Sequence, residues 1–177
     1  MKKNNSPRRI DSEYYEAVAP GSFAERVAVI ARDRIYNDFI RWCAPTEEDT
    51  ILDVGVSDII TKASNALERK YLFPAKITAA GLGAGEDFQA TFPAVAYYQI
   101  EAGERLPFSD GQFTISTANA VLEHVGSLQK QINFISELHR VARKVFITVP
   151  NRFFPIDTTL QFPLCIGPTL DFDLHVS

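Results

Sequence analysis

The apolar positions change their spacing repeatedly along the chain, and this alternation predicts a succession of helices and strands. Ser22 and Glu25 have the spacing of a capping box, and an apolar stripe follows them at helical intervals. The stripe consists of Ala24, Ala28, Ala31, Ile35, Phe39 and Trp42. It predicts a first helix that ends at Pro45. A second stripe with the same 3.6-residue period, from Leu128 to Ala142, predicts the last helix.

Short apolar runs between these helices predict strands at 50–56, 76–80, 95–100, 113–118 and 145–149, with further helices at 58–70 and 86–90. The run 50–56 is apolar except at Asp53 and Gly55, which is typical of a strand that is covered on both faces. Strands that are joined through helices favour parallel pairing with right-handed crossovers. The pattern therefore predicts an α/β fold, a Rossmann-like open parallel sheet of about five strands with helices on both faces.

The domain organisation follows from the same pattern. Residues 1–21 are expected to form an N-terminal arm, 22–155 the folded domain and 156–177 an apolar C-terminal tail. The tail is too short to cross a membrane and is interrupted by Pro163 and Pro168. We expect it to be covered, either over the open edge of the sheet or against a second copy of the chain in a homodimer.

Composition narrows the classes of function. The 177 residues carry a net charge of −4, with 46% hydrophobic and 23% charged residues, as in a chain that buries a core. A weakly acidic chain gives no electrostatic reason to expect nucleic acid. No apolar run reaches the length of a membrane span, and the N-terminus lacks a secretory apolar region, so a cytoplasmic protein is expected. Cys43 and Cys165 lack CxxC spacing, which predicts free buried thiols and no metal site.

In open α/β sheets, ligands bind beyond the carboxyl ends of the strands. That rule selects the segments 53–58, 81–82, 101–103, 119–125 and 150–154 as candidates for a site. Three sequence segments at or near these strand ends carry a family resemblance. They are Glu-Ala-Gly-Glu-Arg-Leu-Pro-Phe-Ser-Asp-Gly-Gln-Phe at 101–113, Ala-Val-Leu-Glu-His-Val at 120–125 and Ile-Thr-Val-Pro-Asn-Arg at 147–152.

In this order, the three segments resemble class I S-adenosylmethionine-dependent methyltransferases of the type 11-like group, and the likeness runs from about 49 to 155. The resemblance implies that the domain binds S-adenosylmethionine and transfers its methyl group to a small-molecule or biosynthetic-intermediate acceptor. The cofactor-binding residues that it implies are Asp53, Gly55, Ser57, Gly81, Leu82, Glu101, Ala102, Glu123 and His124. His124 is also the candidate for a catalytic residue.

The chain departs from the family pattern in two places. Ser57 and Ile59 stand where the family has further glycines, and Gly81 stands where it has the acid that binds the ribose hydroxyls. Glu86 or Asp87 could supply that acid from the following loop. About 27 residues follow Pro150, which indicates that the family's C-terminal strands are missing.

These departures favour an alternative, a catalytically silent methyltransferase-like domain that acts as a binding or scaffolding module. A nicotinamide site is disfavoured because the Gly-x-Gly-x-x-Gly turn is absent after the first strand.

Overall fold

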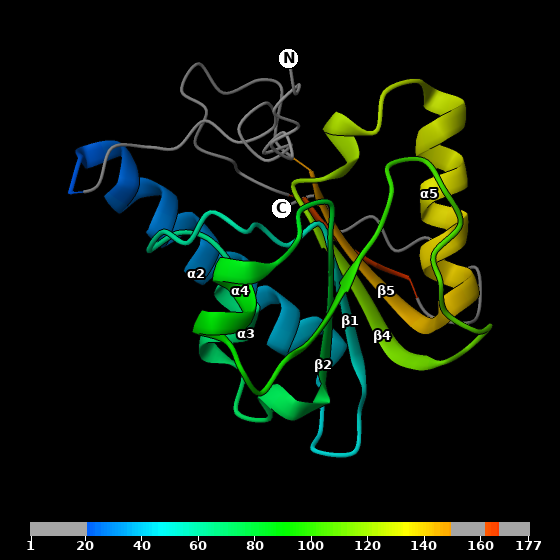
Figure 1. The fold of residues 1–177 in the computed structure, drawn as a ribbon, viewed down its shortest axis with the longest axis horizontal. Coiled ribbons are helices and arrows are strands. Elements are labelled where there is room, and N and C mark those ends of the chain that lie inside the picture. The colour runs from blue at the N-terminus through cyan, green and yellow to red at the C-terminus, as the bar shows by residue number, and fades with distance from the viewer. Residues whose placement is uncertain (1–20, 150–161, 167–177) are drawn as a thin grey trace, which may run out of the picture.

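The computed structural model describes residues 21–149 and the backbone of residues 162–166. Its six-stranded sheet has the order β3-β2-β1-β4-β5-β6 (Figure 1). The strands are β1 (Ile51–Val54), β2 (Ile77–Gly81), β3 (Ala96–Gln99), β4 (Phe113–Asn119), β5 (Ala142–Val149) and β6 (Phe162–Ile166). The first five pair in parallel, which confirms the predicted Rossmann-like sheet.

The sixth strand corrects the expectation that the sheet ends with β5. β6 lies in the segment assigned to the apolar tail and pairs antiparallel with β5, with Ile166 opposite Val145 and Phe162 opposite Val149. Pro163 had been taken as an interruption, but β6 is an edge strand in the described sheet, where a residue without a backbone N–H is tolerated. The free edge of β5 is therefore covered by the chain itself.

The helices cover both faces of the sheet. They are α2 (Phe23–Cys43), α3 (Ala66–Lys70), α4 (Glu86–Thr91) and α5 (Leu128–Val141), with 3-10 turns η1 (Pro74–Lys76) and η2 (Leu122–His124). Helices α2, α3 and α4 lie on one side of the sheet and α5 on the other (Figure 1). Ser22 is confirmed as the N-cap, because the Glu25 N–H donates to Ser22 Oγ at 3.1 Å, whereas the Glu25 carboxylate accepts from the Gly21 N–H instead of completing the capping box at Ser22.

Two local predictions were wrong. The helix predicted at 58–70 is present only from Ala66 to Lys70, because Ser and Thr hydroxyls in the preceding segment bond nearby N–H groups and compete with helix formation. The apolar stripe of α2 is confirmed at Ile35 and Phe39, which are buried, but is wrong at its two ends. Trp42 is 44% exposed, and Glu25 is buried in place of Ala24.

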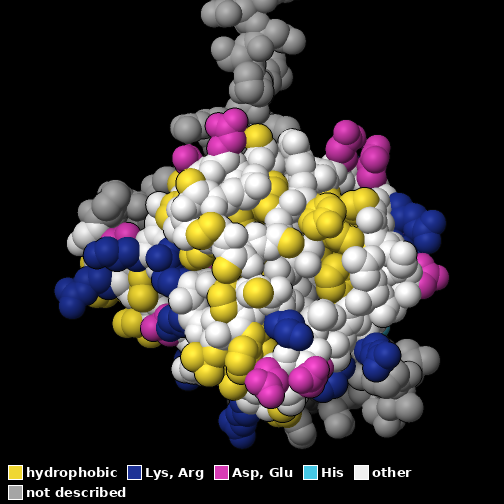
Figure 2. Space-filling view, turned by 60° about the horizontal axis from the view of Figure 1, so that its bottom comes forward, with side chains coloured by type: hydrophobic (Ala, Val, Ile, Leu, Met, Phe, Trp, Pro, Cys, Tyr) yellow, Lys and Arg dark blue, Asp and Glu magenta, His cyan; other side chains and the backbone are white. Residues whose placement is uncertain are grey.

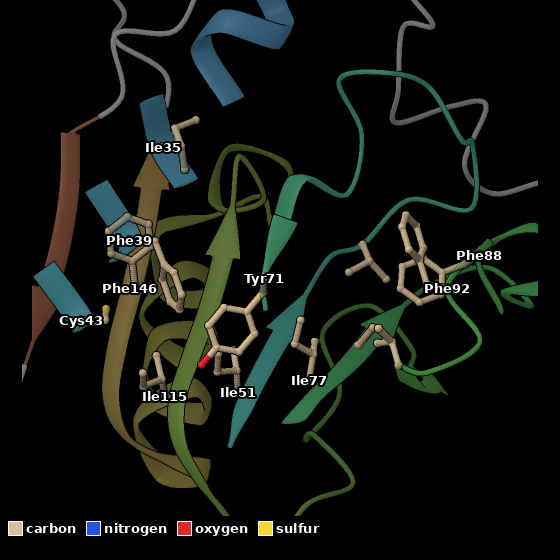
Figure 3. Packing of buried hydrophobic residues seen from close by; sticks show 13 residues of the cluster. Ile35, Phe39, Cys43, Ile51, Tyr71, Ile77, Phe88, Phe92, Ile115 and Phe146 are labelled. Carbon is tan, nitrogen blue, oxygen red and sulfur yellow. The ribbon is translucent and has the colours of Figure 1, made fainter. Parts of the chain in front are cut away.

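Two hydrophobic clusters pack against opposite faces of β1. Ile51 belongs to the cluster under α2, where Phe39 meets Phe146 of β5 edge to face at 5.5 Å (Figure 3). Leu52 belongs to the cluster under α5. All four residues of β1 are buried, so the strand is held from both sides and its end is fixed in space.

Charges on the face shown in Figure 2 are mixed. Lys and Arg side chains lie near Asp and Glu side chains, and hydrophobic side chains are scattered between them. This distribution differs from the single basic patch with which phosphate-binding proteins attract their ligand.

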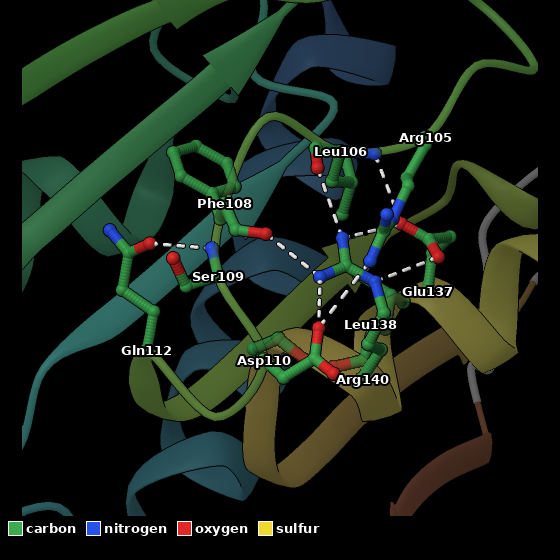
Figure 4. Close-up of polar contacts among 10 residues, drawn as sticks. Arg105, Leu106, Phe108, Ser109, Asp110, Gln112, Glu137, Leu138 and Arg140 are labelled. Atoms are coloured by element: carbon green, nitrogen blue, oxygen red, sulfur yellow. Dashed lines mark hydrogen bonds and ion pairs between the residues drawn. The ribbon is translucent and has the colours of Figure 1, made fainter.

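Arg140 at the end of α5 anchors the turn that leads into β4 (Figure 4). Its guanidinium donates to the carbonyl oxygens of Leu106 and Phe108 at 3.0 and 2.8 Å, and it pairs with Glu137 and Asp110. Leu106 and Phe108 are buried in the α5 cluster. This part of the family-like segment 101–113 therefore serves the fold.

We expect Arg140→Ala to lower the free energy of unfolding by about 2–3 kcal/mol, because two carbonyls and Glu137 lose a charged donor. Arg105→Ala is the matched control. Its side chain is 70% exposed, so solvent screens its pair with Asp110 and we expect a much smaller loss of stability. Urea denaturation of both variants measures the difference, and equal losses would show that Arg140 does not anchor this turn.

Candidate functional site

A cavity of about 200 Å³ lies at the carboxyl ends of β1 and β4, under α2. Asp53 from β1 and Thr117 and Asn119 from β4 form its floor. Other lining residues come from α2 and from the loop between β1 and α3. They include Glu25, Arg32, Tyr36, Gly55, Ser57, Thr61, Ser64 and Asn65. The lining combines polar groups with an apolar wall, as small-molecule sites do.

The loop after β1 is shaped by Gly55 and Asn65. Gly55 has φ +96°, and the Val121 side chain occupies the place where its Cβ would lie, so glycine is required here. Asn65, at φ 52°, closes the loop by accepting from the Ser57 N–H at 3.0 Å and donating to the Ser57 carbonyl at 2.8 Å. These two bonds fix the conformation of the loop, so its residues line the cavity instead of extending α3 toward β1.

Asp53 is a charged residue of the cavity floor, and its carboxyl group interacts with that of Glu68 from α3. Asp53 is 9% exposed and Glu68 is 4% exposed. Burial, followed by repulsion from Glu68, raises the pKa of Asp53 well above its usual range, and Arg32 offsets this only in part. Burial likewise raises the pKa of Glu68 to about 7. Both shifts favour the protonated form of a carboxyl group over the ionised form.

The structure brings three of the nine predicted cofactor residues together. Asp53, Gly55 and Ser57 line the cavity, and the other six do not. Gly81 is buried at the end of β2 and Leu82 is half-buried beside it. Glu101 and Ala102 are exposed after β3, and Glu123 and His124 are exposed in η2.

Gly81 has no room for the family's acid. A Cβ there would lie 2.6 Å from Tyr97 Oη and 3.0 Å from the Val56 carbonyl oxygen. Tyr97 Oη is held in place because it donates to the Gly83 carbonyl at 2.7 Å. Glu86 and Asp87, the two acids expected to take the place of the family's ribose-binding acid, are exposed in the first turn of α4.

Several cavity residues were not predicted from the sequence. Glu25 had been assigned only to the capping box, and Arg32 and Tyr36 carried no motif. Glu68, which interacts with Asp53 from α3, carried no motif either. A signal for Glu25 was available, since helical spacing places it on the same face as Arg32 and Tyr36, seven and eleven residues on.

Within residues 21–149, no three His, Cys, Asp or Glu side chains gather in a way that could hold a metal ion. Among the helices that the structure describes, none is long and apolar enough to span a membrane.

The site occurs in a fold of a known enzyme class. A family model described as a methyltransferase domain matches residues 53–145, which is more than half of the chain. The chain therefore belongs to the methyltransferase domain family. This confirms the resemblance to class I S-adenosylmethionine-dependent methyltransferases that the strand-end segments carried.

Solved structures support the same fold. A SAM-dependent methyltransferase from Aquifex aeolicus is 16% identical, with a TM-score of 0.51 over 77% of this chain and 74% of that chain. One from Methanosarcina mazei is 18% identical, with a TM-score of 0.51 and coverages of 66% and 59%. A TehB-like SAM-dependent methyltransferase from Corynebacterium glutamicum is 11% identical, with a TM-score of 0.50 and coverages of 69% and 63%.

At these identities, the likeness establishes the fold alone. The chain spans from 46% to 74% of the length of eight solved structures that it resembles, these three among them. No curated protein sequence matches it.

The buried carboxyl pair predicts that the free energy of unfolding falls as pH rises, which is the opposite of the behaviour of an ion-paired acid. Glu68 ionises near its ordinary pKa of 4.5 when unfolded but near 7 when folded, so the folded state binds more protons between these values and loses stability as pH rises. We expect Glu68→Gln to stabilise the protein at pH 8 by about 1–3 kcal/mol relative to wild type, and by much less at pH 4.5. Urea denaturation at both pH values measures this. The exposed Glu47→Gln serves as control, and an equal effect of the two substitutions would contradict the prediction.

Proposed function

We propose that this protein is an S-adenosylmethionine-dependent methyltransferase whose cofactor binds with its amino-acid end in the cavity at Asp53. The observation that carries the proposal is the position of that carboxyl group. It lies at the end of the central parallel strand, faces a cavity and follows the topology of the methyltransferase family.

The residues of the cavity fit the polar end of such a cofactor. Asp53 offers a carboxyl group to an ammonium, while Ser57, Asn119 and Asn65 offer neutral hydrogen-bonding groups. The volume of about 200 Å³ lies below the roughly 300–1,000 Å³ of sites that enclose a drug-sized ligand. The cavity therefore suits the amino-acid end alone, and we place the nucleoside end outside it, along the ends of β2 and β3.

When bound, S-adenosylmethionine supplies an activated methyl group, so the protein needs no nucleophile of its own and contributes position and exclusion of water. Helix α2 closes the cavity on the side away from the sheet and contributes Arg32 and Tyr36 to its wall. Because His124 is exposed in η2 and does not line the cavity, it is a weaker candidate for a catalytic base than the sequence implied.

A catalytically silent binding module remains the second candidate function. The observation that favours it is the packing of Tyr97 at Gly81, since this leaves no place for the acid that binds ribose hydroxyls in the family. The loss of a charge-assisted hydrogen bond of about 1.5–3 kcal/mol would weaken the binding of the cofactor roughly ten- to a hundred-fold.

Isothermal titration calorimetry with S-adenosylhomocysteine separates the two candidates. The methyltransferase proposal predicts saturable heat at ligand concentrations up to the millimolar range. An absence of heat and of any thermal shift at these concentrations would contradict the methyltransferase proposal. The catalytically silent binding module would then be the candidate function that remains.

We expect Asp53→Ala to weaken the binding of S-adenosylhomocysteine at least tenfold, because the cavity loses the carboxyl group at the end of β1. His124→Ala should change affinity less than about threefold, since its side chain lies outside the cavity. Circular dichroism confirms that both variants are folded. Unchanged affinity in a folded Asp53→Ala variant would place the site elsewhere.

A further inference from the structure

We propose that Asp53 and Glu68 share one proton in the ligand-free protein and release it to solvent when the ammonium group of the ligand binds at Asp53. Glu68 is then a positioning residue that acts through Asp53, and affinity for an ammonium ligand rises with pH. The inference rests on the proposed function, because the ligand it names is the amino-acid end of the cofactor.

The carboxyl pair itself gives the first argument. Neither Oε1 nor Oε2 of Glu68 has a hydrogen-bond partner within the described residues, although the residue is only 4% exposed. A second carboxylate cannot provide the missing bond, since ionised carboxylates only accept. A proton on one of the two groups turns the contact between Glu68 and Asp53 into a hydrogen bond. The geometry therefore favours a resident proton.

The surrounding charges give the second argument. Arg32 from α2 faces Asp53, and Arg69 from α3 acts on Glu68. The Arg69 guanidinium is directed away, because it donates to the Thr61 carbonyl at 2.9 Å and lies over the ring of Phe92. Glu25, also from α2, adds a further buried acid to the cavity wall and accepts from the Gly21 N–H at 2.6 Å.

Two buried acids, Glu25 and Asp53, thus line a cavity in which Arg32 is the basic side chain among the described lining residues, and the buried Glu68 interacts with Asp53 from outside that lining. The acidic groups at this site outnumber the basic ones, so a further positive charge would be bound favourably. A proton supplies part of that charge in the free protein. An ammonium group at Asp53 brings a full positive charge to the same place, stabilises both carboxylates and makes the proton dispensable.

The test is calorimetry with S-adenosylhomocysteine from pH 5.5 to 7.5, in pairs of buffers with different ionisation enthalpies, which counts the protons released. For wild type we expect a release approaching one proton at the lower pH values, with affinity rising by up to about tenfold per pH unit. Glu68→Gln keeps the shape of the side chain and removes its acid. In this variant, the release and the pH slope should both fall by at least half.

5′-Methylthioadenosine, which lacks the amino-acid end, is the control ligand and should show neither effect. A purely structural role of Glu68 would instead lower affinity equally at every pH without changing the proton count, and that result overturns the inference. Binding of S-adenosylhomocysteine to wild type without proton release overturns it as well, while the proposed function stands. If S-adenosylhomocysteine does not bind, the proposed function fails and this inference fails with it.

Discussion

The burial of one carboxyl group at the end of the central strand is the constraint on which the site depends. Asp53 continues a strand that is covered on both faces, so its side chain leaves the sheet at a fixed point beneath α2. Burying an acid is costly unless it is paired or protonated. Glu68, placed behind it by α3, adds to that cost rather than relieving it. The site thus holds unfavourable electrostatics, which the ammonium group of the proposed ligand would relieve.

The rest of the molecule supplies the rigidity that this arrangement requires. Phe39 and Phe146 fasten α2 to the sheet near the cavity, and the Arg140 network fastens the turn before β4 on the side of α5. β6 adds a further strand beside β5. Because packed elements shift little, we expect the floor of the cavity and the helix above it to keep their separation.

The sequence predicted the sheet well because its strands are short apolar runs bounded by Pro, Gly and polar residues, as around β1 and β5. It predicted part of the site for a related reason. The ends of strands can be located from the sequence, whereas the directions of the side chains at those ends cannot. The segment 58–65 was misjudged because hydroxyl and amide side chains there bond locally, which periodicity does not reveal. Glu68 could not be found at all. Its importance comes from the tertiary contact with Asp53, and no spacing along the chain encodes that contact.

A crystal structure of the protein with S-adenosylhomocysteine tests the central claim most directly. The account predicts that the amino group of the ligand lies within hydrogen-bond distance of the Asp53 carboxyl group, with the nucleoside outside the cavity along the ends of β2 and β3. A ligand whose amino group lies away from Asp53, with the cavity under α2 unoccupied, would contradict the account. It would show that the buried carboxyl pair serves another purpose in this fold.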